Sequence, residues 1–61
     1  MNTNPYITIH VGEEMFKGQR SKVVSQLEAI GYQAERENNP AEAHKYFQAA
    51  ENQKRQGKQA Q

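Results

Sequence analysis

Hydrophobic and polar residues alternate near the N-terminus, from Tyr6 to Val11. Ile7, Ile9 and Val11 would share one face of an extended strand, and β-branched residues favour that conformation. A strand must pair to satisfy its backbone hydrogen bonds, and no other segment of this chain resembles a second strand. The pattern therefore predicts an extended arm over residues 1–12 whose strand pairs with the same segment of a second subunit.

Beyond this arm the hydrophobic residues recur with the period of a helix. Glu13 and Glu14 suit a first helical turn, because carboxylates there meet the positive end of the helix dipole. The spacing predicts a helix over residues 13–37, with one apolar stripe on its surface. Gly18 weakens the first part of this helix by about 1 kcal/mol relative to Ala, which leaves open a bend at Gly18 or a start near Ser21. The members of the stripe are Phe16, Val23, Leu27, Ile30 and Ala34.

A break at residues 38–39 predicts a turn and a second helix. Asn39 suits the N-cap, and Pro40 suits the first helical position, where its missing N–H costs nothing. Glu42 stands three residues after Asn39, as in a capping box. We therefore expect a helix over residues 40–56.

Two helices joined by so short a connection fold back on each other. Gly57 is placed to end the second helix, which leaves residues 57–61 as a disordered tail. The predicted fold is all-α: an antiparallel two-helix hairpin, with the N-terminal arm or strand, in a dimer. Its predicted core consists of Val23, Leu27, Ile30, Ala34, Ala43, Phe47 and Ala50.

Dimerisation is expected because the chain has 61 residues, of which only 34% are hydrophobic. A chain of that size buries only about 60% of the surface that it exposes when unfolded, so its core is small. Several large hydrophobic residues also lie away from the apolar stripes, or on a part of the first helix that the second is too short to cover. They either complete a homodimer core or bind a further, unidentified protein. The predicted interface residues are Ile7, Ile9, Met15, Phe16, Tyr32 and Tyr46.

No residue pattern in the chain is typical of catalysis or of a cofactor or metal site. The chain has no Cys, and neither His10 nor His44 has the neighbours of a metal site. No stretch is apolar enough for a membrane span or a secretion signal, so we expect a cytoplasmic protein that does not bind membranes. The net charge of +1 does not favour nucleic acid as the partner.

Leu27, Ile30, Gly31 and Ala34 precede the predicted turn, and Ala43, Phe47 and Ala50 follow it, at regular spacings. From Leu27 to Arg55 this spacing resembles a tetratricopeptide repeat. In this region Gly31 is small where two helices would cross. The chain departs from the family at Leu27 and Ala34, where aromatic residues are preferred, and near Arg55, where the family has a Pro. It implies a protein-binding helical hairpin whose open face is covered by other subunits or by a partner. The matching residues are Leu27, Ile30, Gly31, Ala34, Ala43, Phe47 and Ala50.

In its overall type the chain is also similar to small accessory proteins of temperate bacteriophages. That similarity implies a modulator of a host or phage protein, and it rests on no motif. The leading hypothesis is therefore a non-enzymatic protein–protein interaction module.

An alternative hypothesis is a DNA-binding regulator, because a strand followed by two helices resembles the ribbon-helix-helix repressors. Their paired strands enter the major groove of DNA. No Lys or Arg lies on the predicted strand, which argues against this alternative. In this interpretation Tyr6, Thr8 and His10 would face bases, and Lys17, Arg20 and Lys22 would face phosphates.

Overall fold

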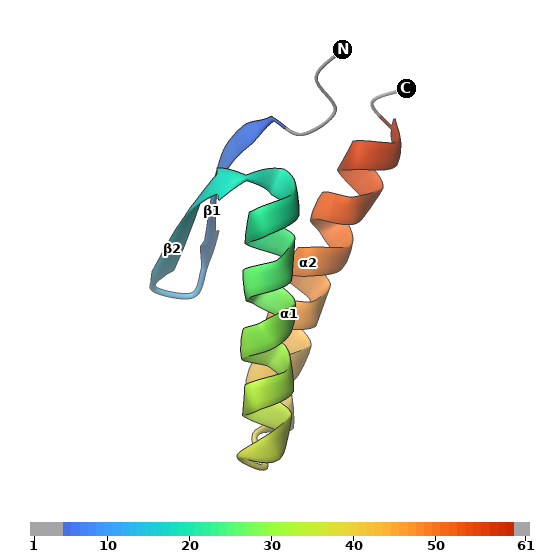
Figure 1. The fold of residues 1–61 in the computed structure, drawn as a ribbon. Coiled ribbons are helices and arrows are strands. Elements are labelled where there is room, and N and C mark those ends of the chain that lie inside the picture. The colour runs from blue at the N-terminus through green and yellow to red at the C-terminus, as the bar shows by residue number, and fades with distance from the viewer. Residues whose placement is uncertain (1–4, 60–61) are drawn as a thin grey trace.

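The computed structural model describes the backbone of residues 5–59 and the side chains of residues 5–56. Two strands form a hairpin that lies beside a pair of antiparallel helices (Figure 1). The fold is therefore α+β, and the all-α class predicted from the sequence is wrong. In chain order the elements are β1 (Tyr6–Val11), β2 (Glu14–Gln19), α1 (Arg20–Arg36) and α2 (Pro40–Gln59).

The β-hairpin is closed by a tight turn at Gly12. Gly12 has a φ of +63°, whereas Glu13, the other residue of the connection, has no positive φ. A glycine with positive φ at the first of two central residues is typical of a type II′ turn, whose twist suits a hairpin. In the resulting antiparallel register, Ile9 lies opposite Phe16. β1 thus pairs within its own chain, so an unpaired strand gives no reason to expect a second subunit.

The segment that precedes α1 was predicted to be helical from residue 13, and this prediction is wrong. Residues 14–19 form β2, and α1 begins only at Arg20. The backbone N–H of Arg20 donates a hydrogen bond of 2.9 Å to the carbonyl oxygen of Pro5, which joins the start of α1 to the start of the hairpin. Phe16 therefore packs from a strand, although its spacing from Val23 also fits a helical stripe.

Residues 37–39 connect the two helices, and the chain turns at Asn38, which has a φ of +64°. The backbone N–H of Asn39 donates to the carbonyl oxygen of Ala34 at 2.9 Å, and that of Asn38 donates to Glu35 at 3.0 Å. This pair of bonds is a Schellman motif, with Asn in place of the usual Gly. α2 then begins at Pro40, where the sequence predicts the second helix to start.

The C-terminal end of α2 differs from the prediction. The helix continues to Gln59, whereas the sequence predicts that it ends at residue 56 and that residues 57–61 form a disordered tail. A single Gly in a helix costs only about 1 kcal/mol relative to Ala, and no Pro follows to stop the helix. Residues 60–61, and residues 1–4 of the predicted arm, lie outside the described part of the chain.

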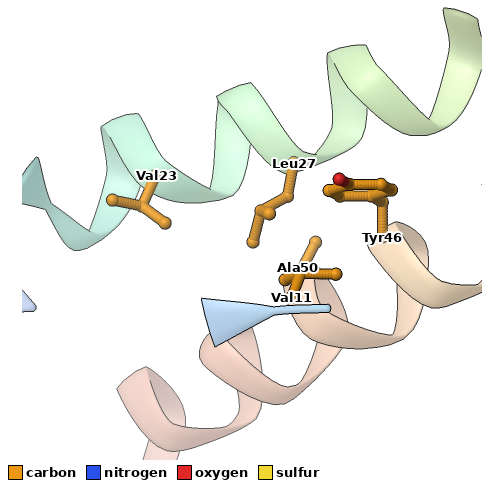
Figure 2. Packing of buried hydrophobic residues seen from close by; sticks show 5 residues of the cluster. All are labelled: Val11, Val23, Leu27, Tyr46 and Ala50. Atoms are coloured by element: carbon orange, nitrogen blue, oxygen red, sulfur yellow. The ribbon is translucent and has the colours of Figure 1, made fainter. Parts of the chain in front are cut away.

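The hydrophobic core is built from β1 and both helices, and Figure 2 shows side chains from all three elements converging on it. Val23 and Leu27 are completely buried at its centre. The β-hairpin closes one side of this core. The buried hydrophobic residues are Val11, Val23, Leu27, Ala34, Ala43, Tyr46 and Ala50.

Candidate interaction surface

Two consecutive aromatic residues of α2, Tyr46 and Phe47, pack on different sides of the helical pair. Consecutive helical residues point about 100° apart around the axis. Tyr46 faces the β-hairpin, where its ring meets that of Phe16 edge to face at a centroid distance of 6.1 Å. Phe47 instead meets Tyr32 of α1, at 5.1 Å with an interplanar angle of 67°. Each side of the helical pair therefore has its own aromatic pair.

The side without the hairpin is named here the open flank. Val24, Glu28 and Tyr32 contribute to it from α1, where a spacing of four residues places them on one face. Phe47 and Lys54 contribute from α2, and both contact this face of α1. Tyr32 is 57% exposed although its ring is held against Phe47. The open flank therefore presents to solvent an aromatic ring that packs against Phe47.

Gly31 lets Phe47 pack closely against α1. A Cβ atom at this position would lie 2.6 Å from Cε1 of the Phe47 ring, well inside van der Waals contact. The ring therefore occupies the space that any other side chain would need. The Phe47 ring therefore packs directly against α1 at Gly31, beside Tyr32.

Charges of opposite sign lie beside the aromatic pair. The Nζ atom of Lys54 lies 2.6 Å from Oε2 of Glu28. The hydrogen bond and the negative charge of Glu28 raise the pKa of Lys54 above its ordinary value. At this height along the helix axes, the open flank thus carries a negative charge on α1, from Glu28, and a positive charge on α2, from Lys54.

The residues predicted to form the core differ in how deeply they lie. Ile30 and Phe47 are only partly buried, and Phe47 lies on the open flank. The other five, Val23, Leu27, Ala34, Ala43 and Ala50, are buried.

The six predicted interface residues do not form one surface. Tyr46 is only 5% exposed and belongs to the core of its own chain. Met15 is 53% exposed, but it lies on the outer face of the β-hairpin, opposite His10. Only Tyr32 lies on the open flank. The remaining three, Ile7, Ile9 and Phe16, are partly buried against the core.

Three residues of the open flank were not predicted from the sequence: Val24, Glu28 and Lys54. The two on α1 carry a signal, because both lie at four-residue spacings from Tyr32. Lys54 has no comparable signal, since its contact with Glu28 depends on how the two helices align.

Metal sites and membrane spans were also sought among the described residues. They contain no group of three or more His, Asp or Glu side chains that could hold a metal ion. None of the helices in the described part of the chain is long and apolar enough to cross a membrane. In comparisons with known proteins, the chain matches no protein-family model, no curated protein and no solved structure.

Proposed function

We propose that this chain is a non-enzymatic protein-interaction module that associates with a second copy of itself through the open flank. The observation that carries the proposal is the exposed Tyr32 ring, packed against Phe47 on the side of the helices that the β-hairpin leaves uncovered. Aromatic residues are enriched in the buried centres of protein interfaces.

The contact between the Tyr32 and Phe47 rings favours binding. A side chain that is mobile in the free protein loses about 0.5–1.5 kcal/mol of conformational entropy when an interface immobilises it. The edge-to-face contact with Phe47 already restricts the Tyr32 ring in the single chain. Covering this ring therefore gains apolar burial at a reduced entropic cost.

The charges on the open flank favour a second copy as the occupant. Glu28 on α1 and Lys54 on α2 lie at the same level, because they are in contact. A twofold axis that runs parallel to the helices places α1 of one copy against α2 of the other. Each Glu28 then faces a Lys54, and no like charges are opposed.

The same twofold axis also suits the aromatic residues. Tyr32 of one copy meets Phe47 of the other, so the two aromatic pairs cover each other. The two helical pairs form a four-helix bundle with antiparallel neighbours, and both β-hairpins remain on its outside. The tetratricopeptide-like spacing supports this arrangement, since such hairpins bury their open faces against neighbours. The lack of Cys supports a cytoplasmic location.

The proposal is tested by a pair of tyrosine substitutions. Tyr32→Ser removes the exposed ring from the open flank, and Tyr6→Ser removes a ring that is 79% exposed on the β-hairpin. Sedimentation equilibrium over a range of protein concentrations measures the dimer dissociation constant of each protein. We expect Tyr32→Ser to weaken dimerisation by about tenfold or more, which corresponds to about 1.4 kcal/mol, and Tyr6→Ser to leave it unchanged.

A wild-type chain that stays monomeric at all measured concentrations would disprove the proposal. Equal weakening by both substitutions would show that the open flank is not the contact surface. Circular dichroism of both variants controls for loss of fold.

A further inference from the structure

The charged residues are unevenly distributed over the molecule. The start of α1 lies beside the last turns of α2 (Figure 1), where Nε of Arg20 donates a hydrogen bond of 3.3 Å to Oε1 of Gln53. We name the half of the molecule that holds residues 16–28 and 50–56 the basic end. Its described acidic side chains are Glu28 and Glu51. Its described basic side chains are Lys17, Arg20, Lys22, Lys54 and Arg55.

The opposite half has the reverse balance. Its only described basic side chains are Arg36 and Lys45, and Lys45 forms an ion pair with Glu42. The acidic side chains there are Glu13, Glu14, Glu35, Glu37 and Glu42. The small net charge of the chain therefore conceals two halves of opposite sign, and the basic end attracts anions.

A hollow in the basic end lies where the β-hairpin meets α1. Its volume is about 360 Å³, within the range of about 300–1,000 Å³ that is typical of small-molecule sites. Tyr6 at its edge is 79% exposed and belongs to the outward face of the hairpin. The hollow is lined by Tyr6, Lys17, Gly18, Gln19, Lys22 and Gln26.

The two lysines of the hollow are available to a ligand. Among the described side chains, the ion pairs are Lys45 with Glu42 and Lys54 with Glu28, so neither Lys17 nor Lys22 is neutralised. The first turn of α1 contains no acidic residue. An anion in the hollow would thus meet two ammonium groups and no nearby carboxylate on that turn.

We propose that the basic end binds single-stranded nucleic acid. A backbone phosphate lies between Lys17 and Lys22, and an adjacent base stacks on the exposed ring of Tyr6. Single-strand binding proteins combine these two elements, a positively charged groove and an aromatic ring that holds a base. The hollow shares no residue with the open flank, so this inference does not rest on self-association.

A single strand fits this surface better than a duplex. In a duplex the bases are stacked on each other, so none is free to cover Tyr6. A two-stranded ribbon that entered the major groove would bring its tip between two phosphate backbones. The tip of this hairpin carries Glu13 and Glu14, which phosphates would repel. Apart from His10, the outward face of the hairpin has one basic residue, Lys17.

Fluorescence anisotropy with labelled oligothymidylate of about 12 nucleotides tests the inference, since single-strand sites span roughly 4–16 nucleotides. We expect Tyr6→Ser to weaken binding by at least about fivefold, the effect of losing about 1 kcal/mol of stacking. In the Lys17→Gln, Lys22→Gln double variant, the slope of log K against log salt concentration should become shallower by about 1.4, because two phosphate contacts are lost.

Lys45→Gln is the matched control, because it removes an exposed lysine from the opposite half and should leave both affinity and salt slope unchanged. Oligouridylate and a duplex of the same length are the comparison probes. Binding of either single strand in preference to the duplex supports the inference. No binding of single strands at about 50 mM salt, tighter binding of the duplex, or an equal loss in Lys45→Gln would overturn it.

Discussion

Each side of the helical pair carries an edge-to-face aromatic pair, but the two sides differ in how much of that pair is exposed to solvent. On one side Tyr46 packs edge to face with Phe16 from the β-hairpin, and only 5% of the surface of Tyr46 remains exposed. On the other side Phe47 packs edge to face with Tyr32, which remains 57% exposed. The aromatic chemistry is the same, but only the first pair has a cover.

This difference shows that so short a chain buries the apolar surface of only one side of its helical pair. A pair of helices has two sides to cover, and the hairpin of β1 and β2 packs against only one of them. The covered side contributes folding stability, because it removes apolar surface from water in the single chain. On the open flank, the Tyr32 ring stays exposed to solvent in the single chain, and the proposed association would cover it.

Alanine substitutions at the two consecutive aromatic residues of α2 should separate these roles. We expect Tyr46→Ala to destabilise the fold by about 3 kcal/mol or more, the usual cost of removing a buried aromatic side chain. That is a large part of the roughly 3–9 kcal/mol available to a chain of this length. Phe47→Ala should cost about 1–2 kcal/mol, because Phe47 is only partly buried.

Urea unfolding followed by circular dichroism, at a concentration low enough to keep the chain monomeric, measures both values. Equal losses of stability would remove the distinction between the two sides.

Substitution of Gly31 sharpens the comparison on the open flank. Ala is a better helix former than Gly by about 1 kcal/mol, but its Cβ would lie 2.6 Å from the Phe47 ring. We expect Gly31→Ala to destabilise the wild type by about 1 kcal/mol, since crowding outweighs the helical gain. In a Phe47→Ala background the crowding is absent, and the same change should stabilise by about 1 kcal/mol.

This double-mutant cycle isolates the contact between Gly31 and the ring. If Gly31→Ala had the same effect in both backgrounds, the ring would not depend on the glycine.

The smallest expected effect concerns the pH dependence on the covered side. Burial raises the pKa of Tyr46 above the ordinary value of 10.0, and the negative charges of Glu42 and Glu14 add to the effect. The folded state therefore favours the neutral phenol. Its contribution to stability is complete below pH 10 and is lost as the pH rises through the raised pKa.

Tyr46→Phe removes this titration, so the stability of the variant should fall less steeply above pH 10 than that of the wild type. The pKa of Lys54 is also raised above its ordinary value, but its titration is common to both proteins. Urea midpoints measured between about pH 8 and pH 11 test the difference. Parallel curves would contradict it.

The helices were largely predictable because their signals are local. The stripe through Val23, Leu27 and Ala34 has the helical period, and these residues are buried in α1. Asn39 and Pro40 mark the start of α2 by their own backbone preferences. Neither signal depends on a distant part of the chain.

The second strand was missed because its residues gave competing signals. Glu14, Lys17 and Gly18 have low strand propensity, and Phe16 also fitted a helical stripe. The turn did carry a signal, since Gly followed by one further residue is a known two-residue hairpin connection. The strand at Tyr6–Val11 needed a partner, and the nearest candidate was the segment just beyond Gly12.

The residues of the open flank were predicted only in part, for a geometric reason. The sequence predicts Phe47 in the core and Tyr46 at the interface, whereas the structure buries Tyr46 in the core and leaves Phe47 partly buried on the open flank. Both lie near the apolar stripe of α2, about 100° apart. Which one is buried depends on the side that the β-hairpin covers, and that information lies outside the helix.

The central claim, that the open flank joins two copies of the chain, is tested most directly by a charge exchange. Glu28→Lys leaves only positive charges at this level of the flank, and Lys54→Glu leaves only negative ones. Each variant alone should therefore dimerise more weakly than the wild type, because like charges are opposed across the twofold axis.

Sedimentation equilibrium of an equimolar mixture of the two variants is the deciding measurement. We predict that the mixture dimerises more strongly than either variant alone, since each lysine then faces a glutamate of the other copy. A mixture no more associated than its separate components would contradict the account.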